Sequence, residues 1–413
     1  MSRAGTALVV GAGLGGLAVH VFARRSPWRR YPWYLPGLGI GIAGTEAGVP
    51  VAGAQVAAGA LAAGLGAYRG RVGVAGLALT AGTAFGLLRL HRVATQTSVA
   101  ELNGALADVL GYDRTPIEVP KRSRSERRSY LAERDLVYGT DSPAQVLDIW
   151  RRPDLPTDAG AGVLVMVHGG SWVGGSKRAA SPGLLAALAE RGWVCVSIDY
   201  RLGPGNRWPS PIVDVKKAIA WVRANIAEHG GDPAFIAVAG GSAGAHLAAL
   251  AALTGNDPQF QPGFAEADTS VQAAVPLYGI YDLTARNDDG STRLRDYLRR
   301  VLFDADFAED PTTWRAASPV WRLRADAPPM FVVHGDRDEI VSVGQARQFI
   351  EAARPISRFG YAELPYAHHS FDLVPSARTR ATEHAIGQFL ETVRDRAKNP
   401  VPVPQAVSVE QDD

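Results

Sequence analysis

The stretch from residue 235 to residue 253 constrains the fold more than any other part of the chain. Phe235–Ala239 is a short apolar run that predicts a buried strand, and Ala243–Leu253 is rich in Ala and Leu and predicts a helix. Between them the chain reads Gly-Gly-Ser-Ala-Gly, centred on Ser242, and these glycines permit a sharp turn in which strand and helix pass close together. Such a turn lifts the serine hydroxyl clear of the sheet. A pentapeptide this short also occurs by chance, so an ordinary glycine-rich turn stays open at this point.

From about residue 130 the chain alternates short apolar runs with helical stretches. Strands are predicted over residues 135–138, 146–150, 163–167, 194–198, 235–239, 273–277, 330–333 and 360–364. Helices are predicted over residues 182–191, 213–229, 243–253, 343–353 and 382–394. Fully apolar strands between helices indicate a mostly parallel sheet with helices on both faces. We therefore expect an α/β domain over residues 130–396.

The first quarter of the chain differs in kind from the rest. Residues 1–100 contain nine Arg, no Lys and one acidic residue, Glu46. Three apolar runs, residues 4–23, 35–67 and 72–88, are long enough to cross a bilayer, and arginines mixed with Trp and Tyr follow the first, as at a membrane interface. We expect residues 1–92 to be a membrane-spanning helical region with three spans. The chain would then be a multi-pass protein of the cell membrane.

The side of the membrane that holds the α/β domain is left open by these residues. With three spans the positive-inside rule places the loop Arg24–Arg30 and the domain in the cytoplasm, whereas two or four spans place the domain outside. A cleaved signal peptide fits less well, because an arginine pair follows Val21-Phe22-Ala23 at once and more apolar runs come later.

A glycine motif inside the first apolar run, from Gly11 to Gly16, matches the dinucleotide-binding pattern Gly-x-Gly-x-x-Gly. That site needs an acidic residue about 20 positions later to bind the ribose, and none occurs before Glu46. We interpret these glycines as small-residue packing between membrane helices and expect no organic cofactor.

Composition narrows the remaining possibilities. A net charge of +2 over 413 residues gives no basis for nucleic-acid binding. The only cysteine, Cys195, lies in an apolar run and is expected to be a small buried residue. No histidines are spaced with cysteines or carboxylates as a zinc site requires, so no metal is expected.

Residues 93–129 are expected to form a linker with a short helix over 99–110, and residues 397–413 a disordered tail.

Ser242 needs a base to become a nucleophile, and the base needs an acid to orient it. Asp338 lies in a Gly-Asp-Arg-Asp turn that follows the strand at 330–333, and is favoured as the acid over Asp336, which suits a turn residue. Two adjacent histidines, His368 and His369, follow the last predicted strand. Their place in the chain makes either a candidate base.

A tetrahedral oxyanion needs backbone amide donors, and a glycine-rich loop follows the strand at 163–167. The amides of Gly169, Gly170 and Ser171 are expected to act with that of Ala243. The next residue, Trp172, is expected to line the substrate pocket. Residues 281–318, rich in charged and aromatic side chains, are expected to be an insertion that caps the site.

Together these motifs resemble the α/β-hydrolase fold and, within it, the hormone-sensitive-lipase-like carboxylesterases. The order Ser, Asp, His and the upstream His-Gly-Gly loop carry the resemblance, with Asp-Tyr-Arg-Leu at 199–202 and Gly-Gly-Asp-Pro at 230–233. The resemblance favours His369 as the base, because the family's histidine precedes a small residue and Phe, as His369-Ser370-Phe371 does. It covers residues 130–396, and membrane-anchored esterases of actinobacterial type have a similar layout.

The chain departs from the family pattern at two positions. Ser171 replaces the third glycine of the oxyanion loop, and Gly241 replaces the acidic residue that usually precedes the nucleophile. Both variants are similar to those of prenylcysteine-methylesterase-like and feruloyl- or acetyl-xylan-esterase-like relatives.

The resemblance implies a serine carboxylester hydrolase, an esterase or lipase, that acts on short- to medium-chain or lipid-like esters. Three alternatives remain at this stage. An acyltransferase would use the same triad but pass the acyl group to an alcohol other than water. A catalytically silent α/β-hydrolase domain would only bind. A flavin or nicotinamide oxidoreductase would use the N-terminal glycines.

Overall fold

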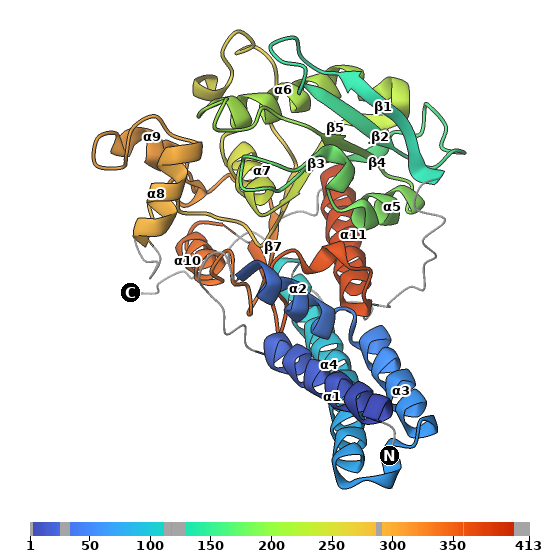
Figure 1. Ribbon diagram of the computed structural model, residues 1–413. Coiled ribbons are helices and arrows are strands. Elements are labelled where there is room, and N and C mark those ends of the chain that lie inside the picture. Colours follow the sequence, from blue (N-terminus) through green and yellow to red (C-terminus); the bar gives the residue numbers. More distant parts are fainter. Residues whose placement is uncertain are drawn as a thin grey trace, which may run out of the picture.

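The computed structural model describes residues 3–24, 34–110, 117, 129–285, 291–357 and 359–399. An eight-stranded sheet forms the centre of the molecule (Figure 1). Its strands are β1 Leu131–Val137, β2 Val146–Trp150, β3 Ala161–Val167, β4 Val194–Ile198, β5 Gly231–Gly241, β6 Ala273–Leu277, β7 Met330–Gly335 and β8 Phe359–Leu364. Their order is β1-β2-β4-β3-β5-β6-β7-β8. The pairs β1–β2 and β2–β4 are antiparallel, and the remaining pairs are parallel.

Helices cover both faces of this sheet because the central strands are apolar on both sides. One core contains side chains of α6 Ser210–Asn225, α7 Ala243–Leu253 and α10 Gly344–Ala353. The core on the opposite face contains side chains of α5 Pro182–Glu190 and α11 Ala377–Lys398. The expected mostly parallel sheet with helices on both faces is confirmed. The expected disordered tail lies outside the described residues, apart from residues 397–399 at the end of α11.

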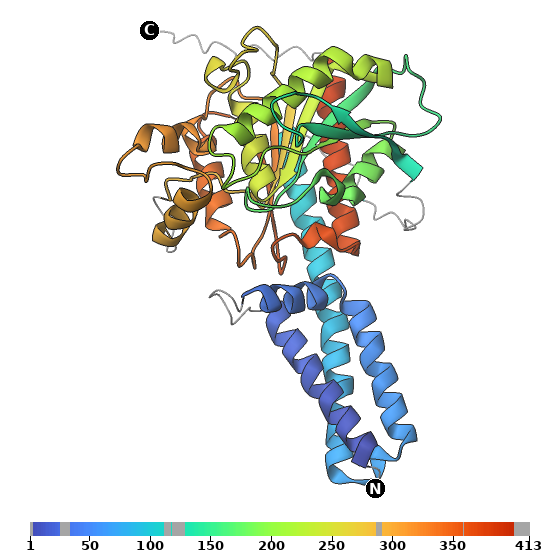
Figure 2. The ribbon, with the colours of Figure 1, turned by 45° about the horizontal axis from the view of Figure 1, so that its top comes forward.

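The N-terminal helices form a bundle that projects from the α/β domain (Figure 2). They are α1 Arg3–Arg24, α2 Tyr34–Thr45, α3 Gly48–Gly64 and α4 Arg71–Leu110, with a short 3₁₀ turn at Ala67–Arg69. Two of them, α1 and α4, are long and apolar enough to cross a membrane. The pair α2–α3 bends by 88° and gives a third candidate span if it counts as one. In Figure 2, α2 lies across the end of the bundle that faces the α/β domain.

The bundle exposes apolar side chains that a soluble helix would bury. Large examples on its surface are Leu14, Val56, Leu61, Val72 and Phe85. Their distribution over α1, α3 and α4 is the pattern that lipid chains would cover.

Helix α4 contains the helix expected over residues 99–110 and corrects the expected linker over residues 93–110. The helix continues without a break to Leu110, and no proline occurs between Pro50 and Pro116 to end it earlier. Its C-terminal part is buried on the sheet, where Leu102 and Leu106 join the core with α5 and α11. One helix therefore belongs to both the bundle and the α/β domain. The rest of the expected linker, apart from residues 117 and 129, lies outside the described residues.

The dinucleotide-like glycines lie in the middle of α1, not between a strand and a helix. A side chain at Gly16 would meet Gln55 and Thr83, with a Cβ 2.6 Å from the Thr83 hydroxyl, whereas no atom of the described residues lies within 4 Å of a Cβ at Gly15. The motif therefore serves helix packing, as the missing acidic residue indicated.

This packing predicts that Gly16→Leu destabilises the bundle and Gly15→Leu does not. Overpacking a tight contact costs about 1–3 kcal/mol, so the thermal unfolding midpoint in detergent is expected to fall by roughly 2–5 °C for Gly16→Leu only. Equal midpoints for the two variants would contradict the packing interpretation.

Candidate active site

Ser242 lies at the turn between β5 and α7 in a conformation that L-residues rarely adopt, with φ +57° and ψ −121°. Its amide donates to the carbonyl of Leu277 at 3.0 Å, which ties the turn to the end of β6. A Cβ on Gly244 would lie 2.2 Å from the carbonyl oxygen of Val167. Only glycine allows α7 to pass so close to β3, and this close approach raises the serine above the sheet.

Position 241 is occupied by glycine, whereas the family that the sequence resembles usually has an acidic residue there. The structure gives a steric reason for this glycine. A Cβ at this position would lie 2.6 Å from the hydroxyl of Tyr278. Tyr278 fills that space and packs its ring edge on to the imidazole of His369, with centroids 4.9 Å apart. The departure from the family pattern therefore accompanies an aromatic contact to the candidate base.

His369 lies on the loop after β8, and its Nε2 is 3.0 Å from the Ser242 hydroxyl oxygen. Its Nδ1 is 2.7 Å from Oδ2 of Asp338. An ionised carboxylate only accepts hydrogen bonds, so Nδ1 carries the proton and Nε2 is free to accept from the serine. The neighbouring His368 points elsewhere, with its Nδ1 3.1 Å from Glu339. The structure thus brings His369, and not His368, to the serine.

Asp338 is fully buried after β7 and is surrounded by donors. Its Oδ1 accepts from the amides of Ile340 and Val341 at 2.9 and 2.8 Å. Burial alone would raise the pKa of Asp338, but the electrostatic attraction and the N–H donors of His369 and His334 outweigh it and hold the pKa below its usual range. Asp336 instead accepts from the amide of Tyr366 at 2.6 Å and shapes the adjacent loop.

The glycine loop after β3 lies directly against the serine. A Cβ at Gly169 would be 3.2 Å from that of Ser242, and Gly170 and Ser171 follow with φ +127° and +56°. Within the described part of the chain, the amides of Gly170 and Ser171 have no hydrogen-bond acceptor. Ala243 begins α7, where the first amides of a helix also lack internal partners.

Trp172 follows the glycine loop and belongs to the buried core, and its expected place in the substrate pocket stays a prediction. Its side chain is buried, and its Nε1 donates to Nδ1 of His246 at 3.2 Å. Burial lowers the pKa of His246 to about 4, which keeps this ring neutral and able to accept. The indole therefore packs in the core and supports the loop from behind.

Residues 281–318 fold into α8 Ser291–Val301 and α9 Pro311–Ala316, with residues 286–290 outside the described chain. The hydroxyl of Tyr297 on α8 donates to the carbonyl of Ser171 at 3.0 Å. Phe303 and Trp314 of the same segment stack with their ring centroids 4.2 Å apart. The segment therefore contacts the glycine loop, a contact that the sequence alone did not specify.

Two further neighbours of the cluster were also missed from the sequence. His334 lies 3.3 Å from Asp338, and Tyr278 follows β6. Their positions at the carboxyl ends of parallel strands were the available signal. Among the described residues, no group of three or more His, Cys, Asp or Glu is arranged to hold a metal ion.

Comparison with known proteins identifies similar chains. A family model described as BD-FAE matches residues 147–352. The probable carboxylic ester hydrolase LipM of Mycobacterium tuberculosis is 46% identical over 329 residues, covering 75% of this chain and 76% of LipM. Esterase LipC of the same organism is 48% identical over 322 residues, covering 75% and 78%. A butyrate-bound esterase of Thermogutta terrifontis matches with a TM-score of 0.54 and 26% identity, over 68% of this chain and 98% of its own.

The steric role of Gly244 gives a direct prediction. Gly244→Ala places a methyl group against the Val167 carbonyl, so the variant is expected to lose at least about 2 kcal/mol of stability and most of its activity. Gly205→Ala is the matched control, because no atom in the described part of the chain lies within 4 Å of a Cβ at this position. Thermal unfolding measures both, and an unaffected Gly244→Ala variant would disprove the close approach.

Proposed function

This chain belongs to the α/β-hydrolase carboxylesterases, and we propose that it cleaves esters with Ser242 as nucleophile, His369 as base and Asp338 as the residue that orients the base. The observation that carries this proposal is the continuous hydrogen-bonded chain from Ser242 through His369 to the buried Asp338, at 3.0 and 2.7 Å.

The reaction proceeds in two halves. The Ser242 oxygen attacks the ester carbonyl carbon while its proton passes to Nε2 of His369. The imidazolium is stabilised by the ionised Asp338, whose lowered pKa keeps it charged at neutral pH. His369 then delivers the proton to the leaving alcohol, and a water activated by the same nitrogen releases the acid.

The oxyanion is held by backbone amides of Gly169, Gly170, Ser171 and Ala243. Support comes from the loop's contact with Ser242 and from the free amides of Gly170 and Ser171. Each such donor typically lowers the barrier by about 3 kcal/mol. The segment 281–318 caps the site, supported by the Tyr297 contact to Ser171.

The proposed substrates are short- to medium-chain or lipid-like esters. The butyrate bound to the Thermogutta terrifontis esterase supports the short-chain part, and the apolar bundle supports substrates that partition into lipid. We also propose that α1, α3 and α4 cross the cell membrane, so that the enzyme acts at the bilayer surface. Their exposed apolar side chains support this placement.

The triad predicts a graded loss of activity. Ser242→Ala and His369→Ala are expected to lower kcat by about 10⁴–10⁶, and Asp338→Asn by about 10⁴, because the serine is then no longer activated. Asp336→Asn, which keeps an acceptor for the Tyr366 amide, is the matched control and is expected to lose less than about tenfold. Hydrolysis of p-nitrophenyl butyrate by membranes carrying each full-length variant measures these losses. A similar loss for both aspartates would contradict the assignment.

A further inference from the structure

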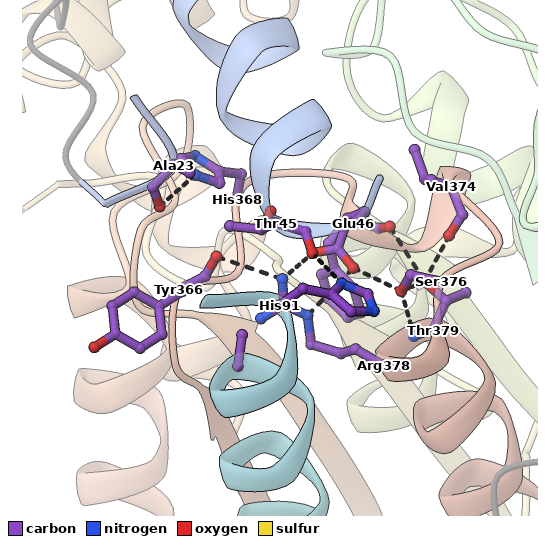
Figure 3. Close-up of polar contacts among 12 residues, drawn as sticks. Ala23, Thr45, Glu46, His91, Tyr366, His368, Val374, Ser376, Arg378 and Thr379 are labelled. Carbon is purple, nitrogen blue, oxygen red and sulfur yellow. Dashed lines mark hydrogen bonds and ion pairs between the residues drawn. The ribbon is translucent and has the colours of Figure 1, made fainter. Parts of the chain in front are cut away.

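The only acidic residue of the first 100, Glu46, lies at the bend between α2 and α3 and is buried. Its carboxylate is paired with the guanidinium of Arg378, which is also buried. The carboxylate accepts a second bond from the Ser376 hydroxyl at 2.6 Å (Figure 3). Burying two charges away from water is costly unless hydrogen bonds satisfy both of them. A buried ion pair is therefore a poor means of only attaching the bundle to the α/β domain, and its burial indicates a further role.

Arg378 extends the contact from the bundle to the loop that carries His369. Its Nη1 donates to the carbonyl of Pro365 at 2.6 Å, and its Nη2 lies 3.4 Å from that of Tyr366. Its guanidinium also lies over the ring of Phe371, 5.9 Å from the centroid. The cation therefore contacts the loop both before and after His369.

The position of Glu46 is itself fixed by the bundle. The imidazole Nδ1 of His91 on α4 contacts the carbonyl of Thr45 at 2.9 Å, just before the bend. The Thr45 hydroxyl donates to the carbonyl of Gly41 one turn earlier. These two hydrogen bonds hold the backbone next to Glu46 and so fix the position of its carboxylate.

A second contact reaches the residue next to the base. The Nε2 of His368 lies 3.4 Å from the carbonyl of Ala23 in α1, and a Cβ on Gly41 of α2 would lie 2.5 Å from the His368 ring. Figure 3 places both the His368 and the Glu46 contacts at the junction of the bundle with the α/β domain. The loop is therefore held between the sheet and the N-terminal helices.

We propose that Glu46 is a positioning residue for the reaction: through Arg378 it fixes the loop 365–371, and so holds His369 in line with Ser242. The N-terminal bundle thereby completes the active site in addition to anchoring it. This inference rests on the role of His369 proposed above.

The test uses full-length protein in membranes and compares Glu46→Gln with the double variant Glu46→Gln/Arg378→Met. The single variant leaves a buried cation without its partner and is expected to be less stable. The double variant removes both charges and is expected to regain stability, but it lacks the bonds to Pro365 and Tyr366. Gln55→Leu, which alters a buried polar contact to Thr83 inside the bundle, is the matched control.

Active sites are counted by end-point labelling with a fluorophosphonate, and kcat and KM are measured with p-nitrophenyl butyrate. Misplacing a reacting group by about 1 Å lowers rates up to about a hundredfold, so both Glu46 variants are expected to lose tenfold to a hundredfold in kcat per labelled site. KM is expected to stay within about twofold, and Gln55→Leu to match the wild type.

The inference is overturned if the double variant regains kcat together with stability, because Glu46 then serves folding alone. It is equally overturned if Glu46→Gln has normal kcat per labelled site. If Ser242→Ala keeps wild-type hydrolysis, the proposed function itself fails. If Ser242→Ala is inactive while both Glu46 variants are normal, only the positioning role is lost.

Discussion

The active site depends on the strained backbone at Ser242. Holding a non-glycine residue at φ +57° costs about 1–3 kcal/mol, and the surrounding core has to offset this cost. The offset comes from β5, buried between β3 and β6, and from α7, whose residues are all buried. The turn between β5 and α7 also needs Gly244, because α7 crosses close to β3. Packing of the central strands therefore sets the position of Ser242, the proposed nucleophile.

The charge of the site depends on hydrogen-bond donors that offset the cost of burying a carboxylate. Asp338 is fully buried, and it stays ionised because four donors surround it. The ionised carboxylate of Asp338 accepts a hydrogen bond from Nδ1 of His369, so that nitrogen carries the proton. The same logic applies to Glu46 and Arg378, a buried pair at the junction with the bundle. Both carboxylates thus fix the orientation of groups on the loop after β8, one from each side.

Much of this arrangement could be predicted from the sequence. Apolar runs predicted the strands closely, and 146–150, 194–198 and 273–277 match the structure to the residue. The spacing of Ser242, Asp338 and His369 placed all three at the carboxyl ends of strands, where the structure brings them together. These successes rest on local patterns: apolar period, turn glycines and position after a strand.

The failures concern contacts between distant segments. The hydrogen bond from Trp172 to His246 joins residues 74 positions apart, and the loop that contains Trp172 gave no sign of it. Residues 93–110 were expected in a linker, yet their apolar face is buried on the sheet. The Glu46–Arg378 pair joins residues 332 positions apart, and no local pattern marks such a contact.

The most direct test of the account is to identify the residue that a fluorophosphonate modifies. The full-length enzyme in membranes is labelled, digested and analysed by mass spectrometry. The proposed mechanism predicts one adduct, on the peptide that contains Ser242, and the loss of this adduct in His369→Ala although the serine is still present. An adduct on another residue, or undiminished labelling of Ser242 without His369, would contradict the proposed mechanism.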